Sequence, residues 1–510
     1  MIFTGSLRNN MHTKITQARY TVFRFLFWIV LVWSTLASWP WSQSITLLNT
    51  EATQISQDLV NVEKERQFPS LKHCKIFILD MTRFAPAVDR KPCTRDERYQ
   101  RSLERSMMMD GIDNGPDSVL NLQIQQHGWT RLLPNAIFAS TLAAVDIDDA
   151  DVVLVDMSCY ADEDVLRWNG NGGYKGLSDA RGALSRLMST PAWTTTQGTG
   201  FVFMGPHPYS YLQAGKHGPC GLLNSYFLAA EPNQMCSIDQ ARTNMTIAPY
   251  SAVAHAFTLQ QILKTERAHL ALFRGSCNGN ASGKRLRSFF AEDIAASKYA
   301  TNPSVIVQCR PWDKNNNSKG QNHTETMREM VKSEFCISMA GDTPSSRRIS
   351  ESIISGCIPV FVGPPWHTLP LPNHIPWEHI ALFFEIRNAS RWPSAGHEDA
   401  SIYSLFNRDA IKFDWPTIPA NAIKYEVDEP REVIQELESY SGAAIAKLRS
   451  LVIAHRPSIM YGGHDLEHSS VGTLAIADDM CAYGQKTRVR DAWQNEKKRL
   501  SGGYLLSPTT

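Results

Sequence analysis

The stretch SEFCISMAGDTPSSRRISESIISGCIPVFVG, residues 333–363, decides the fold class of this chain. Two short apolar runs, Phe335–Met339 and Ile358–Val362, enclose its polar middle, and such β-branched and aromatic runs favour strands. Thr343 and Pro344 are typical of the N-cap and the first residue of a helix between them. A strand, a helix and a second strand in this order predict a parallel α/β sheet built as a nucleotide-binding half-site.

The helix of this stretch is expected to present its N-terminus to an anionic ligand. Gly341 allows a tight turn before the helix, and Gly356 is suited to end it as a C′ residue. Unpaired N–H groups and the helix dipole attract anions at such an N-terminus. Arg347 and Arg348 add positive charge where the dipole alone would favour acids. An anionic ligand, above all a diphosphate, fits this arrangement.

Arg347 and Glu351 are four residues apart and therefore share one face of the helix. One interpretation is a simple surface salt bridge, which contributes only a few tenths of a kcal/mol. The other is that Glu351 accepts hydrogen bonds from ribose hydroxyls while the arginines bind phosphate. The spacing alone leaves both open.

The rest of the chain repeats the alternation of strand and helix, which predicts two doubly wound α/β domains. Residues 206–249 are rich in turn residues and are interpreted as an interdomain region, and 431–454 as one long helix. The strands expected from apolar runs are 75–79, 152–155, 201–204, 270–273, 305–308 and 380–384, and the helices between them include 177–188, 284–296 and 324–331.

The runs GDTPSSRR (341–348) and SGCIPVFV (355–362), with Glu351 between them, resemble the C-terminal signature of exostosin-like glycosyltransferases. They are most similar to the plant-type branch that builds cell-wall polysaccharides. LALFRGSCNGNASGKRLRSFF (270–290) resembles the FRG segment of the family and the basic helix after it. AIFASTLAAVDIDDADVVLVDMSCYA (136–161) and CKIFILDM (74–81) are similar to its N-terminal strands. The resemblance runs from about residue 74 to about residue 461.

This resemblance implies a GT-B-like fold, in which two Rossmann-type domains face each other across a cleft. The pattern of strands and helices predicts the same architecture. The expected organisation is a cytosolic tail (1–24), a signal-anchor segment (25–41), a stem (42–70), an N-terminal acceptor-side domain (71–255), a C-terminal nucleotide-sugar-binding domain (256–425) and a C-terminal helix and tail (426–510).

The resemblance also implies how the departing diphosphate is stabilised. Enzymes of this fold class generally use a helix N-terminus and basic side chains instead of a bound metal, so we expect no metal and no cofactor besides the nucleotide-sugar donor. For Lys284, Arg285 and Arg287 a solvated helix face is an equal alternative. The candidate nucleotide-sugar-binding residues are Arg274, Lys284, Arg285, Gly341, Asp342, Ser345, Ser346, Arg347, Arg348 and Glu351.

A cluster of acids, Asp146, Asp148, Asp149 and Asp151, contains a D-x-D spacing that resembles a metal-binding motif. Metal sites of that type follow a hydrophobic strand, whereas these residues precede one. The cluster is therefore interpreted as a solvated turn with a helix-capping role.

An inverting transfer needs a general base near the acceptor hydroxyl. The candidates are His207, which follows the expected strand 201–204, and Asp80, which follows the expected strand 75–79. The family often has an Asp-His or Asn-His pair before the former strand, but this chain has Gly198-Thr199-Gly200 there. That departure puts the acceptor site, and activity itself, in question.

The N-terminus predicts a luminal location for the catalytic part. Arg8, Lys14, Arg19 and Arg24 precede the apolar segment 25–41, which favours a type II signal anchor in a Golgi membrane. A cleaved signal peptide is the alternative. The ten cysteines fit an oxidising compartment, although their pairing cannot be read from the sequence. Glycosylation sequons occur at Asn244, Asn280, Asn316, Asn322 and Asn388.

With 51 basic and 50 acidic residues, the chain has a net charge of +1, which excludes a typical nucleic-acid-binding protein. We expect an inverting, metal-independent glycosyltransferase that uses a nucleotide sugar, most simply a UDP-sugar, and a glycan or polysaccharide acceptor. One alternative is a catalytically silent homologue that acts as a glycan-binding or scaffold subunit of a synthase complex. The other is a secreted carbohydrate-binding protein. Association with itself or with other glycosyltransferases stays open.

Overall fold

The computed structural model divides the chain into two compact units, residues 1–59 and 60–510. Every residue whose structure is described here belongs to the second unit. The described residues are 68–84, 133–134, 137–138, 140–156, 175–205, 222, 224–229, 245–249, 259–277, 282–310, 323–341, 345–363, 366, 368–387, 393–394, 397–401, 418–460, 471–500 and 503–507.

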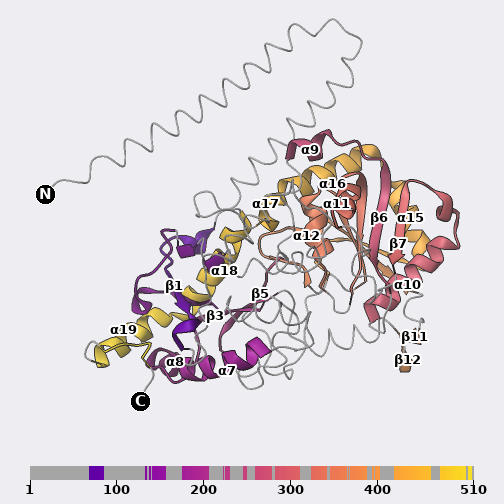
Figure 1. Ribbon diagram of the computed structural model, residues 1–510. Coiled ribbons are helices and arrows are strands. Elements are labelled where there is room, and N and C mark those ends of the chain that lie inside the picture. The colour runs from indigo at the N-terminus through magenta and orange to yellow at the C-terminus, as the bar shows by residue number, and fades with distance from the viewer. Residues whose placement is uncertain are drawn as a thin grey trace, which may run out of the picture. The chain divides into compact units, whose positions relative to one another are not determined.

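The first sheet consists of parallel strands that lie side by side in chain order (Figure 1). Helices α7 (Lys175–Met188) and α8 (Pro191–Thr196) lie between its second and third strands in the chain. Its strands are β1 (Ile76–Asp80), β2 (Val152–Asp156), β3 (Phe201–Gly205), β4 (Tyr226–Ala229) and β5 (Met245–Ile247).

The second sheet is also parallel, and its strand order changes direction at β6. Strand β7 lies on one side of β6 and β8 on the other, so the crossover from β7 to β8 passes over β6. Ligands of open α/β sheets bind beyond the carboxyl ends of the strands at such a switch point. In spatial order the strands are β13 (Ile423–Val427), β10 (Leu382–Ile386), β9 (Ile358–Val362), β8 (Ser333–Ser338), β6 (His269–Ser276) and β7 (Val305–Arg310).

The helices that follow these strands cover both faces of the second sheet. Because β6 to β7 and β7 to β8 run in opposite directions across the sheet, α10 (Ser282–Ala295) and α11 (His323–Val331) lie on opposite faces. The other helices of this part are α9 (Leu259–Lys264), α12 (Arg347–Ile354), α13 (Trp377–Ile380), α15 (Pro430–Ser439), α16 (Gly442–Ala454) and α17 (Arg456–Ile459), and a small antiparallel pair is formed by β11 (Pro393–Ser394) and β12 (His397–Ser401).

The C-terminal segment returns to the first sheet. Helix α18 (Val471–Thr487) packs on β2 and on the short 3-10 helix η1 (Pro69–Leu71), and α19 (Val489–Arg499) packs on α8. In Figure 1 these yellow helices lie among the indigo and magenta elements. Trp493 of α19 is fully buried, and its indole N–H donates to the backbone oxygen of Ala192 at 3.0 Å.

Asp479 of α18 joins the first sheet to the segment before α13. Its carboxylate accepts a hydrogen bond from Thr246 Oγ1 of β5 at 2.7 Å and lies 3.0 Å from His374 Nε2. Asn373 Nδ2 also donates to it at 3.3 Å. The buried core accordingly continues from the first sheet through α18 to the second sheet.

The structure confirms the predicted α/β class with two parallel sheets and refines its details. Residues 206–249 contain strands β4 and β5. These strands are only four and three residues long, which is too short for a pattern of alternating apolar residues to predict them. The expected long helix 431–454 is two helices, because Tyr440 is extended and Ser441 caps a new helix by accepting from the Ala444 N–H at 3.3 Å.

Candidate functional site

Helix α12 follows the carboxyl end of β8 and is defined by caps at both ends. It begins at Arg347, and its N-cap is Ser346, whose Oγ accepts a hydrogen bond from the Arg348 N–H at 3.3 Å. The prediction of Thr343 as the N-cap was therefore wrong, because a second good capping residue lies three positions later. The predicted end is confirmed: Gly356 has a φ of +64°, and the N–H groups of Gly356 and Cys357 donate to the carbonyls of Ile353 and Ser352.

Arg267 closes the C-terminal end of α12 and joins it to α11. Its buried guanidinium donates to the carbonyl oxygens of Ser355 (3.2 Å) and Gly356 (3.0 Å) beyond α12. It also donates to Met330 O (3.1 Å) and Ser333 O (2.7 Å) at the end of α11. One side chain thus satisfies the carbonyls that both helices leave unpaired.

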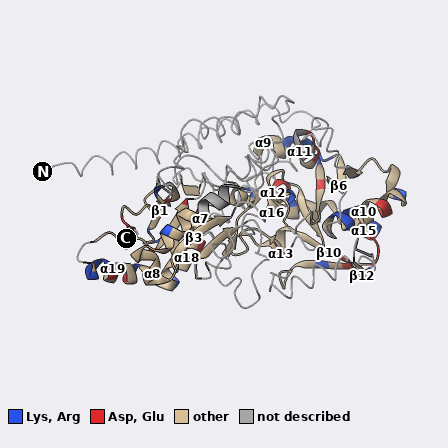
Figure 2. Ribbon diagram, turned by 60° about the horizontal axis from the view of Figure 1, so that its bottom comes forward, with Lys and Arg blue, Asp and Glu red and all other residues tan. Residues whose placement is uncertain are grey.

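Glu351 is paired with both candidate arginines on the same helix. Its side chain is 1% exposed, and its Oε1 lies 3.4 Å from Nε of Arg347. Its Oε2 accepts from Nη1 of Arg348. Figure 2 shows basic and acidic segments side by side on α12. The structure therefore brings the three residues together, and the salt bridge expected at i, i+4 forms with a buried carboxylate instead of an exposed one.

Burial gives this cluster unusual electrostatics. Burial lowers the pKa of Arg347, and the neighbouring Arg348 lowers it further, while Glu351 opposes both effects. A guanidinium that has already lost much of its hydration forms stronger charge-assisted hydrogen bonds with phosphate oxygens. A carboxylate oxygen is also an acceptor of the kind that binds hydroxyl groups.

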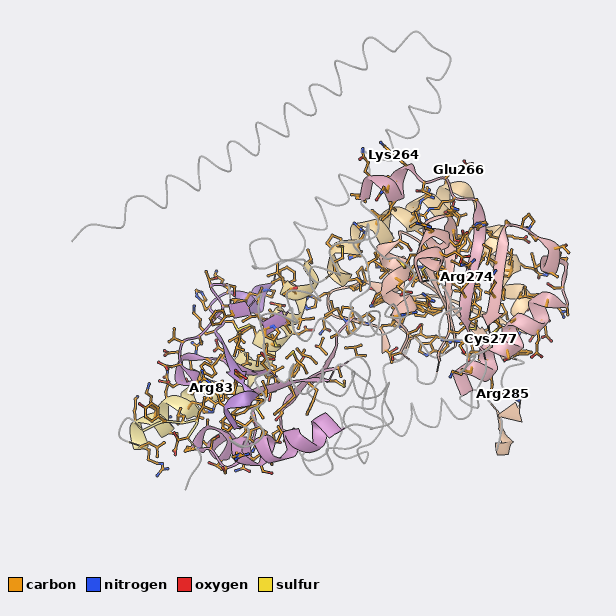
Figure 3. All side chains as sticks on the ribbon, in the orientation of Figure 1. Arg83, Lys264, Glu266, Arg274, Cys277 and Arg285 are labelled. Carbon is orange, nitrogen blue, oxygen red and sulfur yellow. A yellow bond between two sulfur atoms is a disulfide. The ribbon has the colours of Figure 1, made fainter. Side chains whose placement is uncertain are left out.

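Arg274 lies near the carboxyl end of β6, as predicted (Figure 3). Its side chain is 7% exposed, and its Nη1 is 3.2 Å from Oε1 of Glu325 on α11. The partner carboxylate of Glu325 is 46% exposed, so this ion pair reaches the protein surface on its acidic side. The arginine itself is buried.

The start of α10 touches the turn after β8. A Cβ added to Gly283 would lie 2.4 Å from the Gly341 carbonyl oxygen and 2.5 Å from the Ala340 carbonyl carbon, so only glycine permits this contact. Lys284 and Arg285, the next residues of α10, therefore lie at the same sheet edge as Gly341. Figure 3 labels Arg285 on this helix near Cys277, which follows β6.

Arg287 joins the carboxyl ends of β6 and β8, a role that the sequence argument did not assign to it. Its guanidinium donates to the carbonyl oxygens of Ser276 at 3.1 Å and Met339 at 2.8 Å. Arg287 therefore does not lie on a solvated helix face, whereas Lys284 and Arg285 stay candidates for ligand binding. The sequence offered one signal for this role of Arg287: it lies one helical turn after Gly283 and therefore on the same face of α10.

Disulfides fix the same region. Cys277 and Cys309 join the ends of β6 and β7, and Cys336 of β8 is bonded to Cys357 after α12. Cys336 and Cys357 are both fully buried as well as bonded to each other. In the described part of the chain every cysteine belongs to a disulfide, the third bond being Cys74–Cys481.

Asp80, a candidate general base, is the last residue of β1. It is level with Asp156 at the end of the adjacent strand β2, so two carboxylates lie at one edge of the first sheet. The sequence argument missed Asp156, although its position after the apolar run 152–155 was a usable signal.

Gly198 and Gly200, where the family often has a polar pair, are packed against large side chains. Both have positive φ values, 82° and 87°. A Cβ on Gly198 would lie 2.6 Å from the Trp193 ring, and one on Gly200 would lie 2.5 Å from Val489 of α19. Trp193 of α8 and the close approach of α19 therefore leave no room for side chains at Gly198 and Gly200.

The acidic cluster before β2 holds α19. Asp148 accepts a hydrogen bond from Nζ of Lys497 at 2.6 Å, and Asp151 is paired with Arg490. Asp146 is the N-cap of the 3-10 helix η4 (Ile147–Asp149) but makes no side-chain capping bond. The interpretation as a solvated capping turn was thus wrong for Asp148 and Asp151, since basic residues more than 330 positions later were invisible to a local argument.

Several predicted residues lie outside the described part of the chain: His207, Asp342, the anchor segment 25–41 and the sequons at Asn244, Asn280, Asn316, Asn322 and Asn388. Ser345 is described and precedes the N-cap of α12. Among the described residues, no helix combines the length and apolar character needed to cross a membrane. Within the same ranges, no three His, Cys, Asp or Glu side chains gather as metal ligands would.

Comparison with known proteins identifies a family for most of these elements. The family model of the exostosin GT47 domain matches residues 71–395, more than half of the chain. The match includes β1 to β10 and helix α12.

Curated relatives are plant proteins named as glycosyltransferases. A probable glucuronosyltransferase of Oryza sativa subsp. japonica is 26% identical over 332 residues, which is 60% of this chain and 71% of that protein. A probable beta-1,4-xylosyltransferase of Arabidopsis thaliana is 26% identical over 218 residues, 40% of this chain and 49% of that protein. A probable xyloglucan galactosyltransferase of Arabidopsis thaliana is 27% identical over 142 residues, 26% of this chain and 32% of that protein. This chain matches less than half the length of the latter two.

Proposed function

This chain belongs to the exostosin GT47 family of glycosyltransferases, and we propose that it transfers a sugar from a UDP-sugar to a polysaccharide or glycan acceptor with inversion at the anomeric carbon. The relatives' names specify glucuronosyl, xylosyl and galactosyl transfer to their own acceptors. We propose a donor of the same class here.

The observation that carries this proposal is the cluster of Arg347, Arg348 and the buried Glu351 at the start of α12. It follows the carboxyl end of β8, next to the strand at which the sheet order reverses. Two guanidinium groups beside a helix N-terminus suit a diphosphate, and a carboxylate within the same cluster suits the ribose of a nucleotide.

In the proposed reaction the acceptor hydroxyl attacks the anomeric carbon of the donor while the bond to the diphosphate oxygen breaks. The leaving diphosphate gains negative charge, which Arg347, Arg348 and the N–H groups of α12 stabilise. Arg274, Lys284 and Arg285 extend the positive charge along the same edge. These basic groups accelerate the transfer only as far as they bind the diphosphate more strongly in the transition state, where its charge develops, than in the bound donor.

The acceptor proton is transferred to a general base from the first sheet. Asp80 is our candidate among the described residues because it ends β1, where acceptor-side groups of a two-sheet transferase would lie. Asp156 at the end of β2 is its neighbour and a second carboxylate for the same task. His207, which follows β3 in the chain, is the alternative base.

We propose that the reaction needs no metal, because the basic residues of α12 and α10 supply the charge that a divalent cation would otherwise provide. We also propose a Golgi location with a type II anchor at 25–41. The three disulfides of the described part favour an oxidising lumen. The proposed partners are the nucleotide sugar, a glycan acceptor and the membrane, with glycosylation at the sequons.

The test is a thermal-shift screen of the purified chain against UDP, GDP, CMP and a panel of UDP-sugars, with and without Mn²⁺. A ligand that binds only the folded state raises the melting temperature with its concentration relative to Kd. We expect a shift with UDP and one UDP-sugar that is lost in Glu351→Ala and unaffected by Mn²⁺. Glu351→Gln, which keeps the shape of the side chain, serves as the folding control. No shift with any nucleotide would refute the proposal.

A second candidate function is a catalytically silent subunit that binds glycans in a synthase complex. The observation in its favour is the packing of Gly198 and Gly200 against Trp193 and α19, where the family often has a polar pair. Retained UDP binding with neither hydrolysis nor transfer across a broad acceptor panel would favour it.

A further inference from the structure

A row of polar side chains crosses three neighbouring strands of the second sheet near their carboxyl ends. Arg274 of β6 is level with Gln308 of β7. Leu272 is level with Cys336, so Ser338, two residues further along β8, is level with Arg274 on the other side. We call Gln308, Arg274 and Ser338 the polar row.

The polar row lies on the face of the sheet opposite α10. The alternate residues Gly275 and Cys309 face that helix, since a Cβ on Gly275 would meet Arg287 and the Cys309 Sγ lies 3.5 Å from the Arg287 carbonyl oxygen. The row therefore points to the other side, where Glu325 of α11 contacts Arg274.

Among the residues that the structure describes, buried atoms of the polar row have no hydrogen-bond partner. They are Nε of Arg274, Oε1 of Gln308 and Oγ of Ser338, and Oγ of Ser276, on the same face of β6, shares this property. Arg274 is 8% exposed and Ser338 is fully buried. A buried polar atom without a partner costs about 1–3 kcal/mol, so several of them in line require an explanation.

Another serine on the same strand offers a comparison for Ser338. Its strand contains another fully buried serine, Ser333, whose hydroxyl donates to the Glu329 carbonyl oxygen at 2.7 Å. The two serines have the same burial on the same strand, but only the one at the amino end has found a partner. Unmatched polar atoms at the carboxyl end of the switch-point strands indicate a polar ligand.

The hydrogen-bond donors and acceptors of the polar row indicate which part of a nucleotide sugar would bind there. The Arg274 Nε–H can only donate, whereas Oε1 of Gln308 can only accept, and the serine hydroxyl can do both. A diphosphate at neutral pH has acceptors for Arg274 but no donor for Gln308. A sugar ring carries hydroxyl groups that both donate and accept.

We propose that the polar row binds the sugar of the nucleotide-sugar donor, with Gln308 and Ser338 as specificity-determining residues and Arg274 held in place by Glu325. This inference rests on the proposed function and adds binding residues on β7 and at the end of β8. Gln308 accepts a hydrogen bond from a ring hydroxyl, and Ser338 bonds a second oxygen of the same sugar or its link to phosphate.

The experiment compares Ser338→Ala, Gln308→Met and the control Ser333→Ala in the full chain. Isothermal titration gives Kd for UDP, UDP-glucuronic acid, UDP-xylose and UDP-galactose, and thermal unfolding without ligand gives stability. We expect Ser338→Ala and Gln308→Met to raise Kd for the preferred UDP-sugar about threefold to tenfold and to change Kd for UDP less than about twofold.

The unfolding data separate this role from a structural one. Removing the hydroxyl of Ser338 breaks no hydrogen bond seen among the described residues, so the melting temperature of Ser338→Ala should stay the same or rise. Ser333→Ala should melt earlier with unchanged ligand preference. Equal losses for UDP and the UDP-sugar, or no loss for either, would overturn the inference. A wild-type chain that binds no nucleotide at all would refute the proposed function itself.

Discussion

Cys74, just before β1, is bonded to Cys481 of α18, 407 residues further along the chain. Both residues are buried. The disulfide fixes helix α18 to the first sheet. Asp479 and Tyr483 of the same helix also form hydrogen bonds with residues of this part of the chain. Tyr483 accepts a hydrogen bond from the Gly200 N–H at 3.0 Å, and its own hydroxyl donates to the Asn224 carbonyl. The packing of the first sheet therefore depends on helices from the C-terminal end of the chain.

Loss of this disulfide should destabilise the first sheet. We expect Cys74→Ala with Cys481→Ala to lower the free energy of unfolding by about 2–4 kcal/mol, because the bond restricts a long loop of the unfolded chain. Denaturant unfolding under non-reducing conditions measures the change. Either single substitution should have most of the effect of the double variant, since the bond needs both sulfurs. Additive single effects would contradict this account.

Arg267→Met should be among the most destabilising substitutions in the second sheet. The change leaves four carbonyl oxygens at the ends of α11 and α12 without their charged donor. Burial lowers the pKa of Arg267 to about 10, so the group is still charged at neutral pH. We expect a loss of about 3–5 kcal/mol in urea unfolding.

The matched control for Arg267 is Arg499→Met, which removes an exposed guanidinium from its pair with Glu496. That variant should unfold at the same urea concentration as the wild type. Equal effects of the two substitutions would show that the carbonyl contacts of Arg267 contribute little.

Local chemistry made much of the second sheet predictable from the sequence. Ile358–Val362 is a strand with the predicted bounds, and Gly356 ends α12 as expected, because runs of β-branched residues and a C′ glycine act over a few positions. The cluster of Arg347 and Glu351 follows directly from helical spacing.

Contacts between distant parts of the chain could not be predicted in this way. Trp493 fills the core beside Ala192, and Lys497 pairs with Asp148, but no period or motif links those positions. Two of the three members of the polar row were missed for the same reason. Gln308 and Ser338 are unremarkable in their own strands and become a set only when the sheet order places β7 and β8 on either side of β6.

Gly283→Ala should disturb both stability and nucleotide binding. The new methyl group would meet the Ala340 and Gly341 backbone at about 2.5 Å, so α10 must move away from the turn after β8. We expect a loss of about 1–3 kcal/mol in unfolding free energy and weaker binding of UDP. Gly442→Ala is the control, because Gly442 at the start of α16 has no atom within 4 Å of its added Cβ. It should raise stability by about 0.5–1 kcal/mol and leave UDP binding unchanged.

Arg347 and Arg348 should both support UDP binding, and Arg348 should contribute more to folding. Arg347 is 30% exposed, whereas Arg348 is 11% exposed, although both pair with Glu351. We expect Arg347→Ala to raise Kd for UDP about tenfold or more with little change in melting temperature, because it loses charge-assisted bonds to phosphate. Arg348→Ala should also weaken UDP binding, and it should lower the melting temperature more than Arg347→Ala does, because Arg348 is the more buried of the two. Titration calorimetry and thermal unfolding of both variants check this, and identical profiles would contradict it.

Asp478→Asn should stabilise the chain at neutral pH. Burial raises the pKa of Asp478 above 3.8, and the neighbouring Asp479 raises it too, while the Ser70 N–H and His374 oppose the shift. A carboxyl whose pKa is higher in the folded state holds its proton more tightly there. The wild type therefore loses stability as the pH rises from 3.8 through the folded pKa.

Asparagine keeps an oxygen to accept the Ser70 N–H, which donates to Asp478 at 2.8 Å, but it cannot ionise. The variant should thus have a higher free energy of unfolding than the wild type at pH 7 and the same value near pH 3. Urea unfolding at a series of pH values measures the difference between the two curves. A difference that is constant with pH would mean that the substitution acts through packing or hydrogen bonding instead of charge.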